Sequence, residues 1–283
     1  MNLSSLLLIA AGVLIGEIIL AGALSLVHRL GRVGHRVSES LCRAPMLDLV
    51  MAVLTLVPPI AAVAIWSWEG MVAAIGGQLL AVPVWVLMHE TMHRQVARGP
   101  RLVKAQNAIA GRWRNHAALW FSVSALPVFW VVRLGEIVLY LPLRWLLGFP
   151  RYRHGEWVNV SRHKFDGLVG HDLIWCLYCD WMTGIYSLAG EMLRNVESFW
   201  CPIRFYDGKK CENCKLDFPD VERWATPDGT VAPVVRLIED QYDEDRREWF
   251  GHPARLTVNG ETLSSGTSTN RAPVGRQGEG SRG

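Results

Sequence analysis

The sequence predicts a mainly α-helical protein whose N-terminal half is embedded in a membrane. Half of the 283 residues are hydrophobic, whereas only 19% are charged. The apolar residues form long runs before residue 150, and basic residues flank these runs in the manner of cytoplasmic loops between transmembrane helices. Five of the six cysteines come after residue 175, which predicts a separate cysteine-rich region.

These patterns divide the chain into four predicted parts. Residues 1–149 are predicted to form a transmembrane helical domain, with three spans and a fourth hydrophobic or re-entrant segment. Residues 150–225 are predicted to form a small cysteine-rich, metal-binding α+β domain, and residues 226–263 an accessory segment. Residues 264–283 consist largely of Gly, Ser, Thr, Asn and Arg, a composition that predicts a disordered tail. The formal charge of +3 is too small to indicate nucleic acid as a partner.

The first predicted transmembrane helix runs from Leu3 to Val27. Its 25 residues span about 37 Å, enough to cross a hydrocarbon core of about 30 Å. Because the run is long and has no basic residues before it, we interpret it as a retained anchor rather than a signal peptide. Glu17 lies near its middle and is expected to face protein rather than lipid. The loop that follows contains Arg29, Arg32, Arg36 and Arg43, which predicts that this side is cytoplasmic.

Two further spans are predicted before residue 94. The second runs from Met46 to Trp66 and is expected to bend at Pro58-Pro59, because proline removes a helical hydrogen bond. The third runs from Met71 to Met88, with Pro83 as an expected kink. Residues 94–114 are again basic, which places the end of the third span in the cytoplasm.

The next apolar segment, residues 117–147, is interrupted by Arg133 and Glu136. These residues are one helical turn apart and are expected to form an ion pair. A single crossing or a re-entrant or surface-lying hairpin are both compatible with its length. Basic residues after position 150 favour the hairpin and a cytoplasmic cysteine-rich domain. We therefore expect a protein of the bacterial inner (plasma) membrane, with the lipid bilayer as its partner.

The cysteine-rich region begins with a predicted helix from Asp172 to Trp200, which Pro202 is expected to end. Two C-x2-C pairs have the spacing by which two thiolates grip one metal ion: Cys176 with Cys179, and Cys211 with Cys214. Cys201 and His171 are rival ligands. The expected cofactor is zinc or iron, the latter as a mononuclear ion or an iron–sulfur cluster. A redox-active cysteine pair and buried thiols without a metal are the alternatives.

A second candidate metal site is the sequence His89-Glu90-x-x-His93. On a helix its two imidazoles lie on one face, and Glu90 is then the candidate general base for a bound water. The motif resembles that of membrane site-2 proteases, where an Asp before Gly, here Asp166-Gly167, supplies a further ligand. The alternative is that His89 and His93 are interfacial residues stabilised by the helix dipole.

The same motif, followed by Arg94, also resembles the first histidine box of membrane fatty-acid desaturases. That family has two more boxes with adjacent histidines, whereas the later histidines here, His116, His154 and His163, are isolated. The resemblance covers fewer than twenty residues.

Three functions remain open from the sequence. The first is a membrane oxidoreductase or electron-transfer component, in which a cysteine-ligated metal centre at the cytoplasmic surface meets a redox partner. The second is a non-catalytic scaffold or assembly factor of a membrane complex, with a structural zinc knuckle. The third is a membrane metallohydrolase that uses His89, Glu90 and His93.

Overall fold

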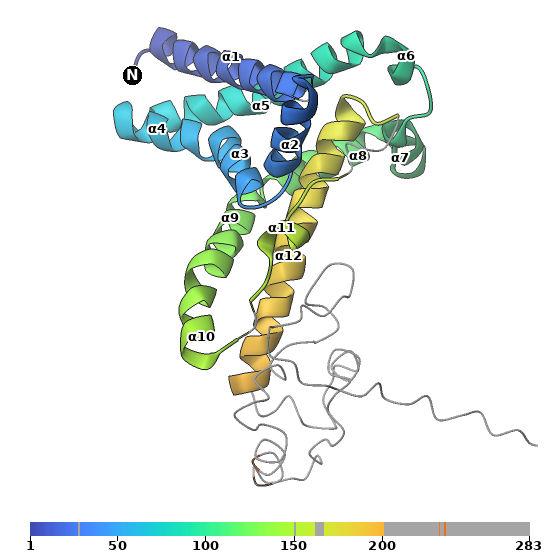
Figure 1. Cartoon of the computed structure of the whole chain (residues 1–283). Helices are drawn as coiled ribbons and strands as arrows, with labels where there is room; N and C mark the ends of the chain where they lie inside the picture. Colours follow the sequence, from blue (N-terminus) through green and yellow to red (C-terminus); the bar gives the residue numbers. More distant parts are fainter. Residues whose placement is uncertain (28, 150, 162–166, 201–231, 233–234, 236–283) are drawn as a thin grey trace, which may run out of the picture.

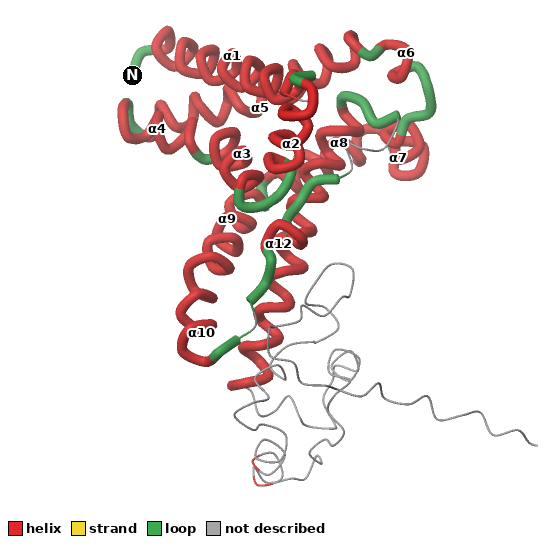
Figure 2. Tube along the Cα trace, in the orientation of Figure 1, coloured by secondary structure: helices red, strands yellow, loops and turns green. Residues whose placement is uncertain are grey.

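The computed structural model describes residues 1–27, 29–149, 151–161 and 167–200, together with residues 232 and 235. These residues are mainly helical, and the named elements among them contain no strand (Figures 1 and 2). In chain order the helices are α1 (Leu3–Val27), α2 (Gly31–Leu41), α3 (Met46–Thr55), α4 (Val57–Ile65), α5 (Trp68–Met92), α6 (Arg94–Ala97), α7 (Leu102–Ala110), α8 (Arg112–Val123), α9 (Leu126–Leu134), the π-helix η1 (Gly135–Leu139), α10 (Tyr140–Leu147), α11 (His154–Trp157) and α12 (His171–Trp200).

Three helical stretches in the described part of the chain are long and apolar enough to cross a membrane. They are Leu3–Val27, Trp68–Met92 and Arg112–Leu147, the last of which combines α8, α9, η1 and α10. The bent pair α3 and α4 adds a fourth if it is counted as one span. This result confirms a mainly helical chain with apolar helices of membrane-spanning length. Whether residues 117–147 cross the membrane stays a prediction.

The second predicted span is broken where the prolines were expected to bend it. Helix α3 ends at Thr55, and Pro58 and Pro59 lie in the first turn of α4. Proline is tolerated there because the first turn of a helix has no internal partner for its N–H groups. The two helices are bent by 46°. In contrast, Pro83 lies inside α5, which continues through it to Met92.

Helix α5 is the central helix of the first helical group and contacts both α1 and α4 (Figure 1). A Cβ atom added at Gly77 would lie 2.4 Å from the carbonyl oxygen of Ala10 in α1. A Cβ atom added at Gly70 would lie 3.1 Å from the carbonyl oxygen of Ala62 in α4. The small residues therefore let the backbones approach closely, which is how helices associate where lipid replaces water.

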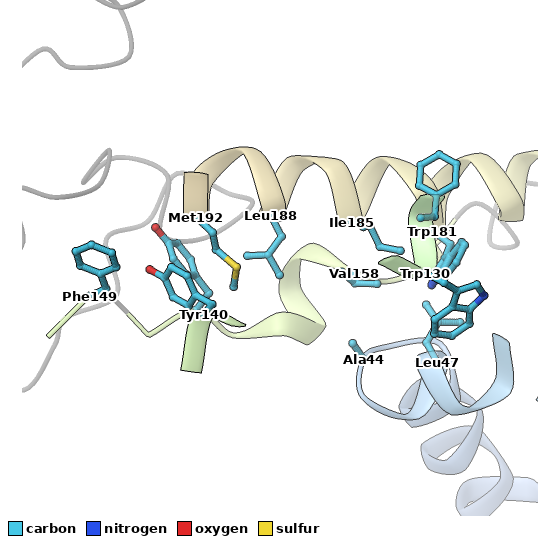
Figure 3. Packing of buried hydrophobic residues seen from close by; sticks show 12 residues of the cluster. Ala44, Leu47, Trp130, Tyr140, Phe149, Val158, Trp181, Ile185, Leu188 and Met192 are labelled. Carbon is cyan, nitrogen blue, oxygen red and sulfur yellow. The ribbon is translucent and has the colours of Figure 1, made fainter. Parts of the chain in front are cut away.

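The second helical group consists of α9, η1 and α10, which run alongside α12 and extend away from α1 and α5 (Figure 1). Trp181, Ile185, Leu188 and Met192 form one buried stripe of α12 at helical spacing. They pack with the buried Phe129 and Trp130 of α9, Tyr140 of α10, and Ala44, Leu47 and Val158 (Figure 3). The helix predicted from Asp172 to Trp200 is thus confirmed. The hydrophobic core around it includes residues from both sides of the boundary that was predicted after residue 149.

The predicted α+β character of residues 150–225 has no support in the described part of that range. Its named elements there are the helices α11 and α12. In the part of the chain that the structure describes, β-type backbone pairing consists of an isolated antiparallel bridge between Arg43 and Asn159. Cys201, Cys211 and Cys214, the accessory segment apart from residues 232 and 235, and the predicted disordered tail lie outside the described residues.

Candidate functional site

Charged and imidazole side chains from four parts of the chain meet beside the end of α5. We refer to them as the histidine–arginine cluster, which comprises His89 and Glu90 of α5, Arg101 immediately before α7, His116 of α8, and His171 and Asp172 in the first turn of α12. Helix α5 continues past Met88, where the predicted span ends, so that His89 and Glu90 lie on regular helix, as the motif was predicted to do. The loop after α5 then brings Arg101 back beside them.

Asp172 is the most highly connected carboxylate of the cluster. Its side chain is 3% exposed and accepts a hydrogen bond of 2.7 Å from Nε of Arg101. It also accepts hydrogen bonds from the backbone N–H groups of Leu102 and Val103, at 3.2 and 3.0 Å, and thereby caps the start of α7. Burial acts to raise the pKa of Asp172, but the contacts with His171, Arg101 and Val103 outweigh it and lower this pKa to about 2. Asp172 is therefore ionised at neutral pH.

Arg101 links Asp172 to Glu90. Its Nη2 donates to Oε1 of Glu90 at 2.7 Å and to the carbonyl oxygen of Val169 at 3.3 Å. Burial acts to lower the pKa of Arg101, but the hydrogen bonds to Glu90 and Asp172 raise it overall. The side chain of Arg101 is only 5% exposed, so its charge is balanced by these two carboxylates rather than by water.

Glu90 is held from two sides. Besides Arg101, the backbone N–H of His171 donates to Oε1 of Glu90 at 3.1 Å. This contact requires Gly170, whose φ is +51° and at which an added Cβ would lie 2.2 Å from Cγ of Glu90. The carboxylate predicted to act as a general base thus connects α5 to the start of α12.

The two histidines of the motif stack with ring centroids 4.3 Å apart. The backbone N–H of Gly170 donates to Nδ1 of His89 at 3.1 Å, so a neutral His89 carries its proton on Nε2. Nδ1 of His93 donates to the carbonyl oxygen of His89 at 3.0 Å, which leaves Nε2 of a neutral His93 as an acceptor. In this arrangement only His93 presents an unprotonated Nε2 to a metal, although two such atoms are needed for the ligand pair of a zincin.

His116 and His171 form a second imidazole pair, edge to face with ring centroids 5.0 Å apart. Nδ1 of His171 is buried and has no hydrogen-bond partner among the described residues. It lies 3.7 Å from Oδ1 of Asp172. Trp175, one turn further along α12, packs against the ring of His171 at 6.1 Å.

The first predicted cysteine pair lies on α12, one to two turns beyond the cluster. Cys176 and Cys179 are three residues apart and therefore share one side of the helix. Both are half-buried. The hydroxyl of Thr183 donates to the carbonyl oxygen of Cys179 and lies 3.9 Å from its sulfur. Both cysteines thus lie on regular α-helix, within the helix that was predicted from Asp172 to Trp200.

Among the described residues, no group of three or more His, Cys, Asp or Glu side chains is arranged to hold a metal ion. The predicted ligands fall into three sets: Cys176 and Cys179 on α12, His89 and His93 on α5, and Cys201, Cys211 and Cys214 outside the described residues. Both metal assignments therefore stay predictions.

Arg101, His116 and Asp172 were not predicted to belong to a common cluster. Arg101 is one of several basic residues in the predicted loop of residues 94–114, and its partner Asp172 lies 71 residues away. The local signal for Asp172 was its place in the first turn of a predicted helix, where an acidic side chain is favoured by the helix dipole.

Comparison of the chain with protein-family models, with curated proteins and with solved structures finds no match.

Proposed function

We propose that this chain is an integral membrane protein that holds a metal ion on cysteine thiolates beside the cytoplasmic ends of its transmembrane helices. The observation that carries the proposal is the position of Cys176 and Cys179, which lie on one side of α12 within its first three turns. The first turn of α12 is tied to α5 and α7 through Asp172 and Arg101. A thiol pair on a helix fixed in this way is a preorganised half-site for zinc or iron.

The helix restricts which cysteines complete the site. A tetrahedral ion needs two ligands besides Cys176 and Cys179. Trp200 lies 21 residues beyond Cys179 in α12, about 32 Å along the helix axis. Because Cys201 follows Trp200 directly in sequence, we propose that it does not share an ion with Cys179. The eleven residues from Trp200 to position 211 reach about 36–40 Å when extended. We therefore propose Cys211 and Cys214 as the other two ligands.

We propose a structural role for this ion, in a non-catalytic scaffold or assembly factor of a membrane complex. An ion between the start of α12 and the chain beyond Trp200 would tie that chain to the membrane part, and such sites contribute folding free energy directly. The ion pairs near the cysteines support a structural role. Glu90 and Asp172 both pair with Arg101 and so attach α12 to its neighbours, which leaves neither carboxylate free to act as a general base.

Electron transfer to a redox partner is the second candidate, and the aromatic rings around the cysteines favour it. Trp175 and Tyr178 flank Cys176 in sequence, with ring centroids 6.1 Å apart. Trp175 also packs edge to face on Trp120 of α8, at 5.8 Å. These ring contacts run from residues adjacent to the two cysteines in sequence to Trp120, which lies in an apolar segment of membrane-spanning length. This candidate requires iron, because zinc has no redox chemistry in proteins.

Elemental analysis of the full-length protein, purified in detergent, tests the proposal. We expect one metal ion per chain, lost in Cys179→Ser and in Cys211→Ser. Cys201→Ser is the matched control and should retain the ion. A parent protein without metal, or equal loss in the control, would overturn the assignment of these ligands. Zinc would support the scaffold, whereas iron with an absorption that dithionite bleaches would support electron transfer.

The same analysis tests the metallohydrolase hypothesis. That hypothesis requires the ion to depend on His93, so His93→Ala should release it while Cys211→Ser retains it. Our proposal expects the reverse, since His93 donates to a backbone carbonyl and is not among the four thiolate ligands.

A further inference from the structure

A second buried charge cluster lies in the other helical group, where α3, α9, η1 and α11 meet. We refer to Asp48, Arg133, Glu136 and His154 as the Arg133 cluster. The sequence predicted the ion pair between Arg133 and Glu136, and the structure contains it. Asp48, which is 85 residues from Arg133 in sequence, and His154 were not predicted as partners. The side chains of Arg133 and Glu136 are 1% and 2% exposed.

The hydrogen bonds define the charge of each partner of Arg133. Its Nε and Nη2 donate to the two oxygens of Asp48, at 3.0 and 2.6 Å, which is the two-pronged geometry of an arginine–carboxylate ion pair. Its Nη1 donates to Nδ1 of His154 at 3.0 Å, which requires an unprotonated Nδ1. Burial and the charge of Arg133 lower the pKa of His154 to about 4, so this histidine is neutral at pH 7.

Glu136 is left as the group that decides the net charge. Arg133 and Asp48 cancel, and His154 adds no charge, so an ionised Glu136 would leave one uncompensated negative charge in an apolar interior. Such a charge is costly, and a buried carboxyl group avoids the cost by taking up a proton. Oε2 of Glu136 accepts from Nη1 of Arg133, whereas Oε1 is buried and has no hydrogen-bond partner among the described residues. Oε1 is thus the oxygen of Glu136 that does not already accept a hydrogen bond from Arg133, and we take it as the position of the proton.

Within the described part of the chain, the other groups near Glu136 do not supply a compensating positive charge. On the α12 side the nearby group is the backbone amide of Ala189, and an amide inside a helix already donates to the carbonyl four residues earlier. Asp48 of α3 adds a negative charge rather than a positive one.

We infer that the Arg133 cluster is a proton-binding site, in which Glu136 is held as a neutral carboxylic acid with its proton on Oε1. The backbone supports the assignment, because Glu136 lies in η1, a single π-helical turn within an otherwise α-helical stretch, and such turns are frequent at functional sites. The bound proton allows α3, α9 and α11 to share one charged guanidinium without a net buried charge. Its loss would place like charges on Glu136 and Asp48 around Arg133.

Infrared spectroscopy of the full-length protein in detergent at neutral pH tests this inference, because a carboxylic acid and a carboxylate absorb at different frequencies. We expect an acid band that disappears in Glu136→Gln and remains in the control Glu156→Gln, which alters a carboxylate paired with the exposed Arg153. Glu136→Gln should unfold at the same temperature as the parent or higher, since glutamine resembles the neutral acid in shape and hydrogen bonding.

Three results would overturn the inference. One is an acid band that is unchanged in Glu136→Gln. Another is a marked fall in the unfolding temperature of this variant, as expected when an ionised partner of Arg133 is removed. The third is stabilisation of the parent, but not of Glu136→Gln, by added Na⁺ or K⁺, which would make a metal cation rather than a proton the ligand.

Discussion

Replacement of Asp172 by Asn should loosen the start of α12 while leaving the rest of the fold in place. Asparagine keeps one carbonyl oxygen as an acceptor for the amides of α7 but removes the charge that pairs with Arg101. The size of the expected loss of stability at the start of α12 follows from the pKa of Asp172. A decrease from 3.8 to about 2 corresponds to about 2.4 kcal/mol of preference for the ionised form. Solvent screening near the partly exposed Glu90 reduces this value, so we expect a loss of about 1–2 kcal/mol.

Amide hydrogen exchange measures this loss at the affected helix ends. A destabilisation of about 1–2 kcal/mol increases the population of the open state about 5- to 30-fold. The amides of Leu102 and Val103 should therefore exchange faster by this factor in Asp172→Asn at pH 7. Asp180→Asn is the matched control, because Asp180 lies on the same helix but accepts from Ser161 rather than from α7.

The pH dependence provides a second check. Because the pKa of Asp172 is lower in the folded protein, its stabilising contribution is fully present above about pH 4 and is lost as the pH falls towards about 2. The difference between the parent and Asp172→Asn should disappear over the same range. If the amide of Leu102 exchanged at the same rate in the parent and in Asp172→Asn at pH 7, the claim that the histidine–arginine cluster attaches α12 would be refuted.

Two glycine substitutions test close contacts. Gly170→Ala should weaken the same attachment by about 1–3 kcal/mol, because its φ is positive and its Cβ would collide with Glu90; unchanged exchange at the start of α12 would contradict this. Gly77→Val should separate α1 from α5, because its Cβ would collide with the carbonyl of Ala10, whereas at Gly76 a Cβ meets nothing within 4 Å. Thermal unfolding in detergent should show a lower transition for Gly77→Val than for Gly76→Val, and equal transitions would refute the close contact.

The features that were predicted correctly depend on residues close together in the chain. A long apolar run such as Leu3–Val27 specifies a helix of membrane-spanning length by its composition, and Pro58-Pro59 break a helix through their own backbone chemistry. The stripe of buried residues on α12 follows from helical spacing in the same way.

The features that were missed depend on partners distant in the chain. The side chains of Arg101 and Arg133 pair with carboxylates 71 and 85 residues away. In the sequence, Arg101 resembles a basic loop residue that sets membrane topology, and Arg133 resembles the partner of a local ion pair. The sequence around a charged residue does not identify a partner that is distant in the chain. The partners of His89 and Glu90 were missed for the same reason, because Gly170 and Arg101 come from later parts of the chain.

X-ray absorption at the edge of the bound metal, measured on the full-length parent protein in detergent, tests the proposed function most directly because it identifies the ligand atoms. Our proposal predicts four sulfur ligands, at about 2.3 Å if the ion is zinc. A first shell of nitrogen and oxygen ligands would contradict it and would move the site to the histidines at the end of α5.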